Sequence, residues 1–335
     1  MSTDPADDSP GRCLCSVVVP VKNAGPILAE VIAALAVQDL PSPFEVLFID
    51  SGSTDGSLER LQDACLRPDW RLFQIRPDEF GHGRTRNLGV SMTSGEFIAF
   101  LTHDAVPADP GWLRELIAPL QRDPEVAGVF GRHIAHAGAS PFIGDELDGH
   151  FKQFRDRPLT WIAEPDRYER DEQYRQFLHF FSSNNACIRR SVWLTLPLPE
   201  VEFAEDQAWA KAAAEAGWKR AYADHAVVRH SHDFGTIETL RRAFDESRSF
   251  RRHFGYRLAP GPLGIARTTV GLTRRDFRTA LQRGYWKDHP LATLRRPLLH
   301  LAKAIGHFLG SHDQRLPVRL ADGLSLDRRL RVGVR

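Results

Sequence analysis

The chain has 335 residues, of which 42% are hydrophobic and 26% are charged, as is typical of a soluble globular protein with one large or two modest domains. Four cysteines without a CxxC pair exclude a zinc ribbon and a disulfide framework. No apolar run reaches the roughly 18 residues of a membrane helix, and the N-terminus is acidic and polar. We therefore expect a cytoplasmic protein.

Strands and helices are predicted to alternate over the first hundred residues. An uninterrupted apolar and β-branched run predicts a buried strand at 14–20, and a proline in the first turn marks a helix over 26–38. The same signals predict strands at 44–50, 70–75 and 96–102, a helix that ends near residue 65, and a helix over 84–93. This βαβαβ order indicates a Rossmann-like nucleotide-binding half.

The alternation is less regular after residue 104. Helices are predicted at 110–121, 205–217 and 236–254, and strands at 126–132, 177–189 and 219–230. The charged and aromatic stretch 138–175 is placed only as a connecting, acceptor-facing region. We predict an α/β protein with a disordered segment at 1–12, a main domain at 13–255 with halves at 13–104 and 105–255, and a helical extension at 256–335.

One carboxylate, Asp104, stands at the carboxyl end of the strand predicted at 96–102. Ligands of open α/β sheets bind beyond the carboxyl ends of the strands, where an Asp can hold a divalent metal against a phosphate. The alternative is that Asp104 only caps the following turn. Oxygen ligands of this kind predict Mg²⁺ or Mn²⁺.

Two further pairs of side chains are candidates for the chemistry. Glu205 and Asp206 open a predicted helix, where acidic residues also serve the helix dipole. We expect Asp206 to be a general base with an ordinary carboxyl pKa of about 4, and Glu205 to orient it or, alternatively, to be the base. His230 and His232 face the same way at the end of a strand, so one of them is expected to reach the metal unless they form a structural pair.

Five short segments, in this order and spacing, resemble the inverting family 2 glycosyltransferases. They are 16–23 (SVVVPVKN), 49–55 (IDSGSTD), 80–89 (FGHGRTRNLG), 102–104 (THD) and 205–206 (ED). The resemblance covers roughly residues 14–255, and segments 49–55 and 80–87 are most similar to bacterial rhamnosyltransferases of polysaccharide assembly. It implies a GT-A fold with a mixed central sheet, dTDP-L-rhamnose as donor, and a glycan or lipid-linked acceptor.

The resemblance also implies site residues. Arg84 and Arg86 are candidates to clamp the diphosphate, unless they are solvated at a helix start, and Asn87 is expected to buttress loops. Thr102 or His103 stands where the family's metal motif has its first acidic residue, and His103 is expected to be a ligand, a donor behind the ligands or a solvated side chain. The donor-binding candidates are Pro20, Val21, Asn23, Asp50, Ser51, His82, Arg84, Arg86, His103 and Asp104; the metal candidates are Asp104, His230 and His232; weaker acceptor candidates are Asn184, Asn185 and Trp209.

The extension is basic and contains an amphipathic segment. Residues 274–335 hold 14 Lys and Arg against 5 Asp and Glu, whereas residues 1–273 hold 30 against 38. Apolar residues recur at helical spacing between Leu298 and Leu309. Either this stripe packs on the catalytic domain, or it binds an anionic surface on the inner face of the cell membrane. Nucleic acid is not expected, because interleaved aromatics are missing.

Several functions remain open at this point. The leading one is single-displacement, inverting transfer of rhamnose from a dTDP donor. A UDP-hexose donor is an alternative. A sugar nucleotidyltransferase is disfavoured, because residues 20–23 lack a glycine- and arginine-rich phosphate loop. An inactive nucleotide-sugar-binding scaffold is retained, because the metal motif has a single carboxylate.

Overall fold

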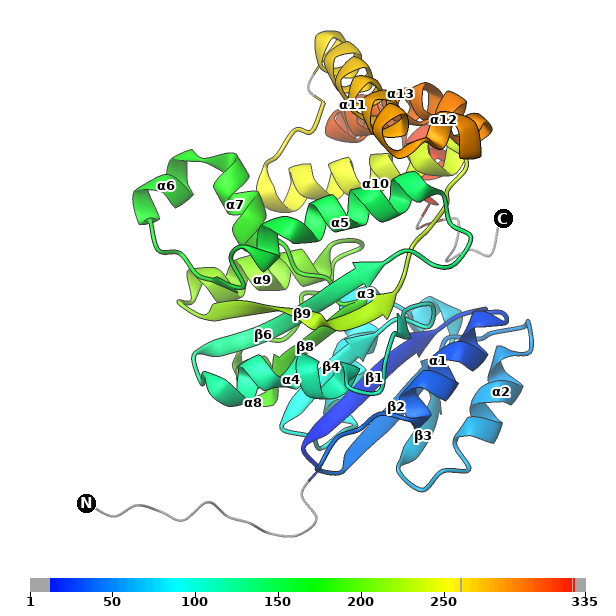
Figure 1. Ribbon diagram of the computed structural model, residues 1–335. Helices are drawn as coiled ribbons and strands as arrows, with labels where there is room; N and C mark the ends of the chain where they lie inside the picture. The colour runs from blue at the N-terminus through cyan, green and yellow to red at the C-terminus, as the bar shows by residue number, and fades with distance from the viewer. Residues whose placement is uncertain (1–12, 260, 327, 329–335) are drawn as a thin grey trace.

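The computed structural model describes residues 13–259, 261–326 and 328, so the disordered segment predicted at 1–12 lies outside the described residues. Its centre is a nine-stranded mixed sheet in the order β3-β2-β1-β4-β8-β6-β9-β5, with β7 paired to β9. Figure 1 shows helices on both faces of this sheet. The mixed central sheet expected from the sequence is confirmed.

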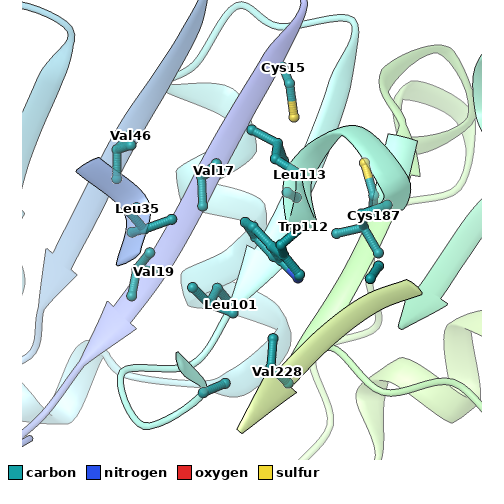
Figure 2. Packing of buried hydrophobic residues seen from close by; sticks show 14 of the residues in the cluster. Cys15, Val17, Val19, Leu35, Val46, Leu101, Trp112, Leu113, Cys187 and Val228 are labelled. Carbon is teal, nitrogen blue, oxygen red and sulfur yellow. The ribbon is translucent and has the colours of Figure 1, made fainter. Parts of the chain in front are cut away.

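The first half is a parallel sheet, as predicted. Its strands are β1 (Cys15–Val21), β2 (Phe44–Asp50), β3 (Trp70–Gln74) and β4 (Phe97–Leu101). Its helices are α1 (Ile27–Ala36), α2 (Ser57–Ala64) and α3 (His82–Ser91), with a short 3₁₀ turn, η1 (Pro77–Glu79). Because β1 is covered on both faces, Val17 and Val19 enter the core shown in Figure 2, while Val18 enters the opposite one.

The second half adds strands of mixed direction. β8 (Asn185–Arg189) runs antiparallel to both β4 and β6 (Val126–Ile134), and β9 (Lys219–Arg229) runs parallel to β6. Two short strands, β5 (Val106–Pro107) and β7 (Leu159–Thr160), pair with β9. The helices are α4 (Trp112–Arg122), α5 (Pro141–Arg155), α6 (Pro165–Arg170), α7 (Glu172–His179), α8 (Arg190–Thr195), α9 (Glu205–Glu215) and α10 (Thr236–Phe254).

The strand predicted at 177–189 is wrong over its first half. Helix α7 occupies 172–179, and only 185–189 is a strand. The Asp171 side chain accepts a hydrogen bond of 3.1 Å from the backbone N–H of Tyr174 and so caps this helix. Tyr174 and Leu178 are buried four residues apart, the spacing of one helix face. The aromatic residues of this segment therefore belong to a buried helix face and not to a strand.

The last helices are α11 (Pro262–Arg283), α12 (Tyr285–Asp288), α13 (Pro290–Ser311) and α14 (Val318–Leu324), with a 3₁₀ turn, η2 (Asp313–Arg315). Helix α13 packs along α10, which lies between the sheet and α11–α13 in Figure 1. A Cβ on Gly306 would lie 2.2 Å from the Leu240 carbonyl oxygen, so the helices touch through backbone.

The amphipathic stripe predicted in the extension is therefore split between two faces of α13. Ala302 is buried, whereas Leu298 and Leu301 are 53% and 39% exposed. Packing on the rest of the protein thus involves mainly small and polar residues and leaves a leucine-rich face outward. Among the described residues, no helix combines the length and apolarity that crossing a bilayer takes.

The close contact of α13 with α10 predicts opposite effects for one substitution at two glycines. Gly306→Ala should destabilise the fold by about 1–3 kcal/mol through overpacking. Gly271→Ala in α11 has nothing within 4 Å of its new Cβ and should stabilise by roughly 0.5–1 kcal/mol. Thermal unfolding of both variants measures this. Equal stabilisation by the two would contradict the helix contact.

Candidate functional site

Three side chains converge beyond the carboxyl ends of β4 and β9. The Nε2 atoms of His230 and His232 lie 3.6 and 3.7 Å from the two carboxylate oxygens of Asp104. Burial lowers the pKa of His230 to about 4, against the opposing charge of Asp104, and burial also lowers the pKa of His232. Both imidazoles are therefore neutral at neutral pH and keep a lone pair. One ligand atom from each residue lies within 4.8 Å of the others, an arrangement that fits a divalent cation.

Other histidines surround this cluster. His103 turns its Nδ1 to the Pro20 carbonyl oxygen at 3.4 Å, and His136 places Nε2 3.2 Å from the Asp104 carbonyl oxygen. The buried His133 ring packs edge-on against His230, with ring centroids 5.2 Å apart. His133 and His136 were not among the residues predicted from the sequence. Their position in the sequence could have indicated them, because they lie near the end of β6, and β6 is the neighbour of β9 in the sheet.

The acidic pair at the start of α9 divides into two environments. Glu205 is buried, and its Oε1 accepts hydrogen bonds from Arg86 Nη1 at 2.8 Å and Ser183 Oγ at 3.0 Å. Asp206 is only half-buried, and its carboxylate accepts from the Ser183 N–H at 3.0 Å. The preceding Ala204 adopts a left-handed φ of 62°, which is strained for a residue with a Cβ.

This division changes the acidity of both groups. Burial and the neighbouring charge of Glu205 raise the pKa of Asp206 to about 6, which corrects the ordinary value expected from the sequence. Burial opposes ionisation of Glu205, but the adjacent Arg86 guanidinium lowers the pKa of Glu205 below its usual value. Asp206 is thus a stronger base than an exposed Asp and is still mainly ionised at neutral pH.

The loops after β1 and β2 are tied to one another. The Asp50 carboxylate accepts from the N–H groups of Gly52 and Ser53, and Ser51 Oγ donates to the Val21 carbonyl oxygen at 3.1 Å. Five donor-binding candidates have buried side chains: Pro20, Val21, Asp50, Ser51 and Arg86. The first four belong to the loops after β1 and β2 or the strands before them, and Arg86 is paired with Glu205 beside Asp206.

The remaining donor-side candidates are accessible. Asn23 is half-buried with φ 45°, and Ala204 is its only counterpart among non-glycine residues of the described chain with positive φ. His82 is half-buried, and Arg84 is exposed and paired with Glu200 at 2.9 Å. Asn87 holds the loop at Leu198 through hydrogen bonds of 2.8 and 3.1 Å, as expected.

Two acceptor-side candidates need correction. Asn185 is fully buried, accepts from Trp112 Nε1 and donates to the Ala226 carbonyl oxygen, both at 2.8 Å. Trp209 is buried, and its Nε1 donates to the Leu196 carbonyl oxygen. Both side chains belong to the core and cannot touch an acceptor, because their polar atoms are already used inside it. Asn184 does line a cavity.

That cavity borders the metal cluster and the residues next to Ser183. It has a volume of about 910 Å³ and is lined by His230 and His232 at the metal cluster and by Ser182 and Asn184, the neighbours of the Ser183 that binds Asp206. It continues between α5, α10, α11 and α13. The two imidazoles of the cation site and the neighbours of the serine that binds Asp206 therefore border one open space that is large enough for a substrate.

Residues 16–194 match the family model described as glycosyl transferase family 2. The chain belongs to this family. Over 317 residues it is 31% identical to the O-antigen chain rhamnosyltransferase RfbN of Salmonella typhimurium, a match that covers 90% of this chain and 91% of RfbN. It is 30% identical, with the same coverage, to the O-antigen chain rhamnosyltransferase WbaN of Salmonella anatum.

Solved structures agree with the fold of this family 2 glycosyltransferase. The mannosyltransferase PcManGT from Pyrobaculum calidifontis is similar with a TM-score of 0.59 and 18% identity, covering 91% of this chain and 88% of PcManGT. S. aureus TarS 1–349 is similar with a TM-score of 0.51 and 18% identity, covering 90% and 91%. The GT-A fold expected from the sequence is confirmed, and the enzyme is a glycosyltransferase of polysaccharide biosynthesis rather than a nucleotidyltransferase.

Proposed function

We propose that this enzyme transfers L-rhamnose from dTDP-L-rhamnose to a glycan or lipid-linked acceptor, with inversion at the anomeric carbon. The observation that carries the proposal is that one cavity is lined by His230 and His232 of the metal cluster and by Ser182 and Asn184, which flank the Ser183 that is hydrogen-bonded to Asp206. The choice of rhamnose is supported by RfbN and WbaN, which are rhamnosyltransferases and match 90% of this chain.

The reaction needs one proton transfer and one displacement. Asp206 takes the proton of the acceptor hydroxyl while that oxygen attacks the anomeric carbon, and the bond from this carbon to the donor phosphate breaks. A divalent cation, when bound, neutralises charge on the leaving diphosphate. Asp104, His230 and His232 are the residues that would hold it. We assign the base to Asp206 rather than Glu205, because Glu205 is buried against Arg86.

We further propose that Mn²⁺ serves better than Mg²⁺. The cluster offers one carboxylate and two imidazoles. Mg²⁺ is a hard ion that prefers oxygen ligands, whereas Mn²⁺, a divalent ion of the first transition row, accepts imidazole nitrogen more readily. PcManGT, which shares the fold, was solved with GDP-mannose and Mn²⁺.

A donor screen tests the function. The purified chain is incubated with Mn²⁺ and, separately, dTDP-rhamnose, UDP-hexoses and GDP-mannose, and release of nucleoside diphosphate is followed. We expect the highest kcat/KM with dTDP-rhamnose. Preference for a UDP-hexose would replace the donor assignment, and no turnover of any donor would favour the scaffold alternative.

The role of Asp206 predicts a separation of catalysis from donor binding. Asp206→Asn should lower kcat by roughly 10²–10⁴, the usual contribution of a positioned base. Affinity for dTDP, measured by calorimetry with Mn²⁺ present, should stay within a factor of two or so, because the carboxylate contacts the acceptor side. A large loss of dTDP affinity would show that Asp206 supports the donor site instead.

The metal cluster predicts a change in cation response. Asp104→Asn keeps the side-chain shape but removes the charge that holds the cation, so turnover should fall steeply and the Mn²⁺ concentration for half-maximal rate should rise at least tenfold, as loss of about 1.4 kcal/mol would give. Asp109→Asn, in the following turn, is the matched control. If the Mn²⁺ concentration for half-maximal rate were unchanged in Asp104→Asn, Asp104 would not be a metal ligand and would only cap the following turn.

We also propose that the outward face of α13 binds an anionic bilayer. Leu291, Leu294 and Leu298 are 75%, 62% and 53% exposed at helical spacing, and Arg295 is exposed among them. Helix α11 adds exposed Leu263 and several exposed arginines. A leucine-rich face flanked by arginines suits acidic headgroups and the acyl boundary below them.

Vesicle co-sedimentation tests this surface. The chain should bind vesicles that contain phosphatidylglycerol, bind less to phosphatidylcholine alone, and dissociate as salt rises. Leu294→Glu with Leu298→Glu should abolish binding without unfolding the protein, because both side chains are exposed. Leu66→Glu, at a side chain 85% exposed elsewhere, is the control. Equal binding by the two variants would contradict the proposal.

A further inference from the structure

The cavity beside the metal cluster is larger than one sugar requires. Its volume of about 910 Å³ is near the upper end of the roughly 300–1,000 Å³ that ligand sites occupy. One wall of its lining includes His150 of α5, Glu246 of α10 and Lys303 of α13, which are close enough to interact electrostatically. A single acceptor sugar at the reactive groups leaves this wall free, so the wall has room for a further part of the acceptor.

Hydrogen-bonding atoms of this cavity lack partners within the protein. The Nε2 atoms of His133 and His150 are buried, and neither has a hydrogen-bond partner in the described part of the chain. His133 is only 6% exposed, and both residues line the cavity. Buried polar atoms are nearly always paired in folded proteins, so these two nitrogens leave hydrogen-bonding capacity beside the cavity.

Glu246 provides a charged acceptor on the same wall. Its Oε2 lies 3.2 Å from His307 Nε2. Burial opposes its ionisation, but the hydrogen bond and charge of His307, with the charges of Lys303 and Arg242, lower the pKa of Glu246 to about 2. The ionised carboxylate has lone pairs left for donors such as sugar hydroxyls.

The charged side chains that line the cavity largely balance one another, and this balance favours a neutral ligand over a phosphate. Asp276 is paired with Arg296 and with His300, and Arg275 bridges Asp276 and Glu146. Aromatic rings also line the cavity: His150 lies 4.5 Å from Phe180 and 5.0 Å from Phe151, centroid to centroid. Apolar rings with a few polar groups suit a carbohydrate, which has both C–H faces and hydroxyls.

We propose that Glu246, His150 and Lys303 form a second glycan subsite, which binds a sugar of the acceptor next to the one that is glycosylated. The proposal rests on the proposed function and deepens it, because it makes the acceptor an oligosaccharide. Since Lys303 lies on α13, the helices after residue 255 select the acceptor in addition to covering α10.

The test compares acceptors of different length. The full chain, Mn²⁺ and the donor found in the screen are assayed with rhamnose-, mannose- and galactose-containing oligosaccharides of one to four residues. The wild type should show a KM at least tenfold lower for its best di- or trisaccharide than for the corresponding monosaccharide. Glu246→Gln should raise the KM of the longer acceptor about tenfold and change its kcat little, so the length preference disappears.

Two controls make the result decisive. Glu238→Gln changes an exposed carboxylate of α10 and is the control for Glu246→Gln. A second test variant is Lys303→Met, and its control is Lys287→Met at an exposed lysine of α12. The controls should keep the length preference, and Lys303→Met should lose it even if Glu246→Gln folds poorly. Equal KM values for all lengths in the wild type overturn the subsite while transfer persists. Absence of donor turnover, with or without acceptor, overturns the proposed function instead.

Discussion

The buried ion pair between Arg86 and Glu205 is the interaction on which the site depends. Its side chains are 3% and 6% exposed, and it joins α3 of the parallel half to α9 of the second half. Removing one partner of such a pair leaves an uncompensated buried charge, which typically costs about 3–5 kcal/mol. The pair therefore fixes the start of α9, and with it the neighbouring Asp206, relative to the parallel half.

The order of the strands in the sheet explains why the reactive groups come from distant segments of the chain. Asp104 follows β4, the last strand of the first half, while His230 and His232 follow β9, two strands beyond β8 in the sheet order. The mixed direction of the second half brings the end of β9 to the edge where β4 ends. Helix α13, which touches α10 through Gly306, adds Arg296, His300 and Lys303 to the lining of the cavity.

The sequence predicted the strands that are buried on both faces, because an uninterrupted apolar and β-branched run such as 14–20 indicates a buried strand. It also brought Asp104, His230 and His232 together, since strand ends meet at one edge of a sheet. It failed where tertiary contacts decide. Nothing local shows that Trp209 and Asn185 are buried, that Arg86 faces Glu205, or that the leucines of α13 point outward while its glycines meet α10.

Burial and the negative charge of Glu205 together raise the pKa of Asp206. The most direct test is the pH dependence of kcat/KM in the wild type and in Glu205→Gln, with protein stability measured alongside. The wild-type value should fall below a pH of about 6, where Asp206 becomes protonated. In Glu205→Gln the negative neighbour is gone and Arg86 is unpaired, so the fall should move to lower pH. The same profile in both proteins would contradict the roles given to this pair.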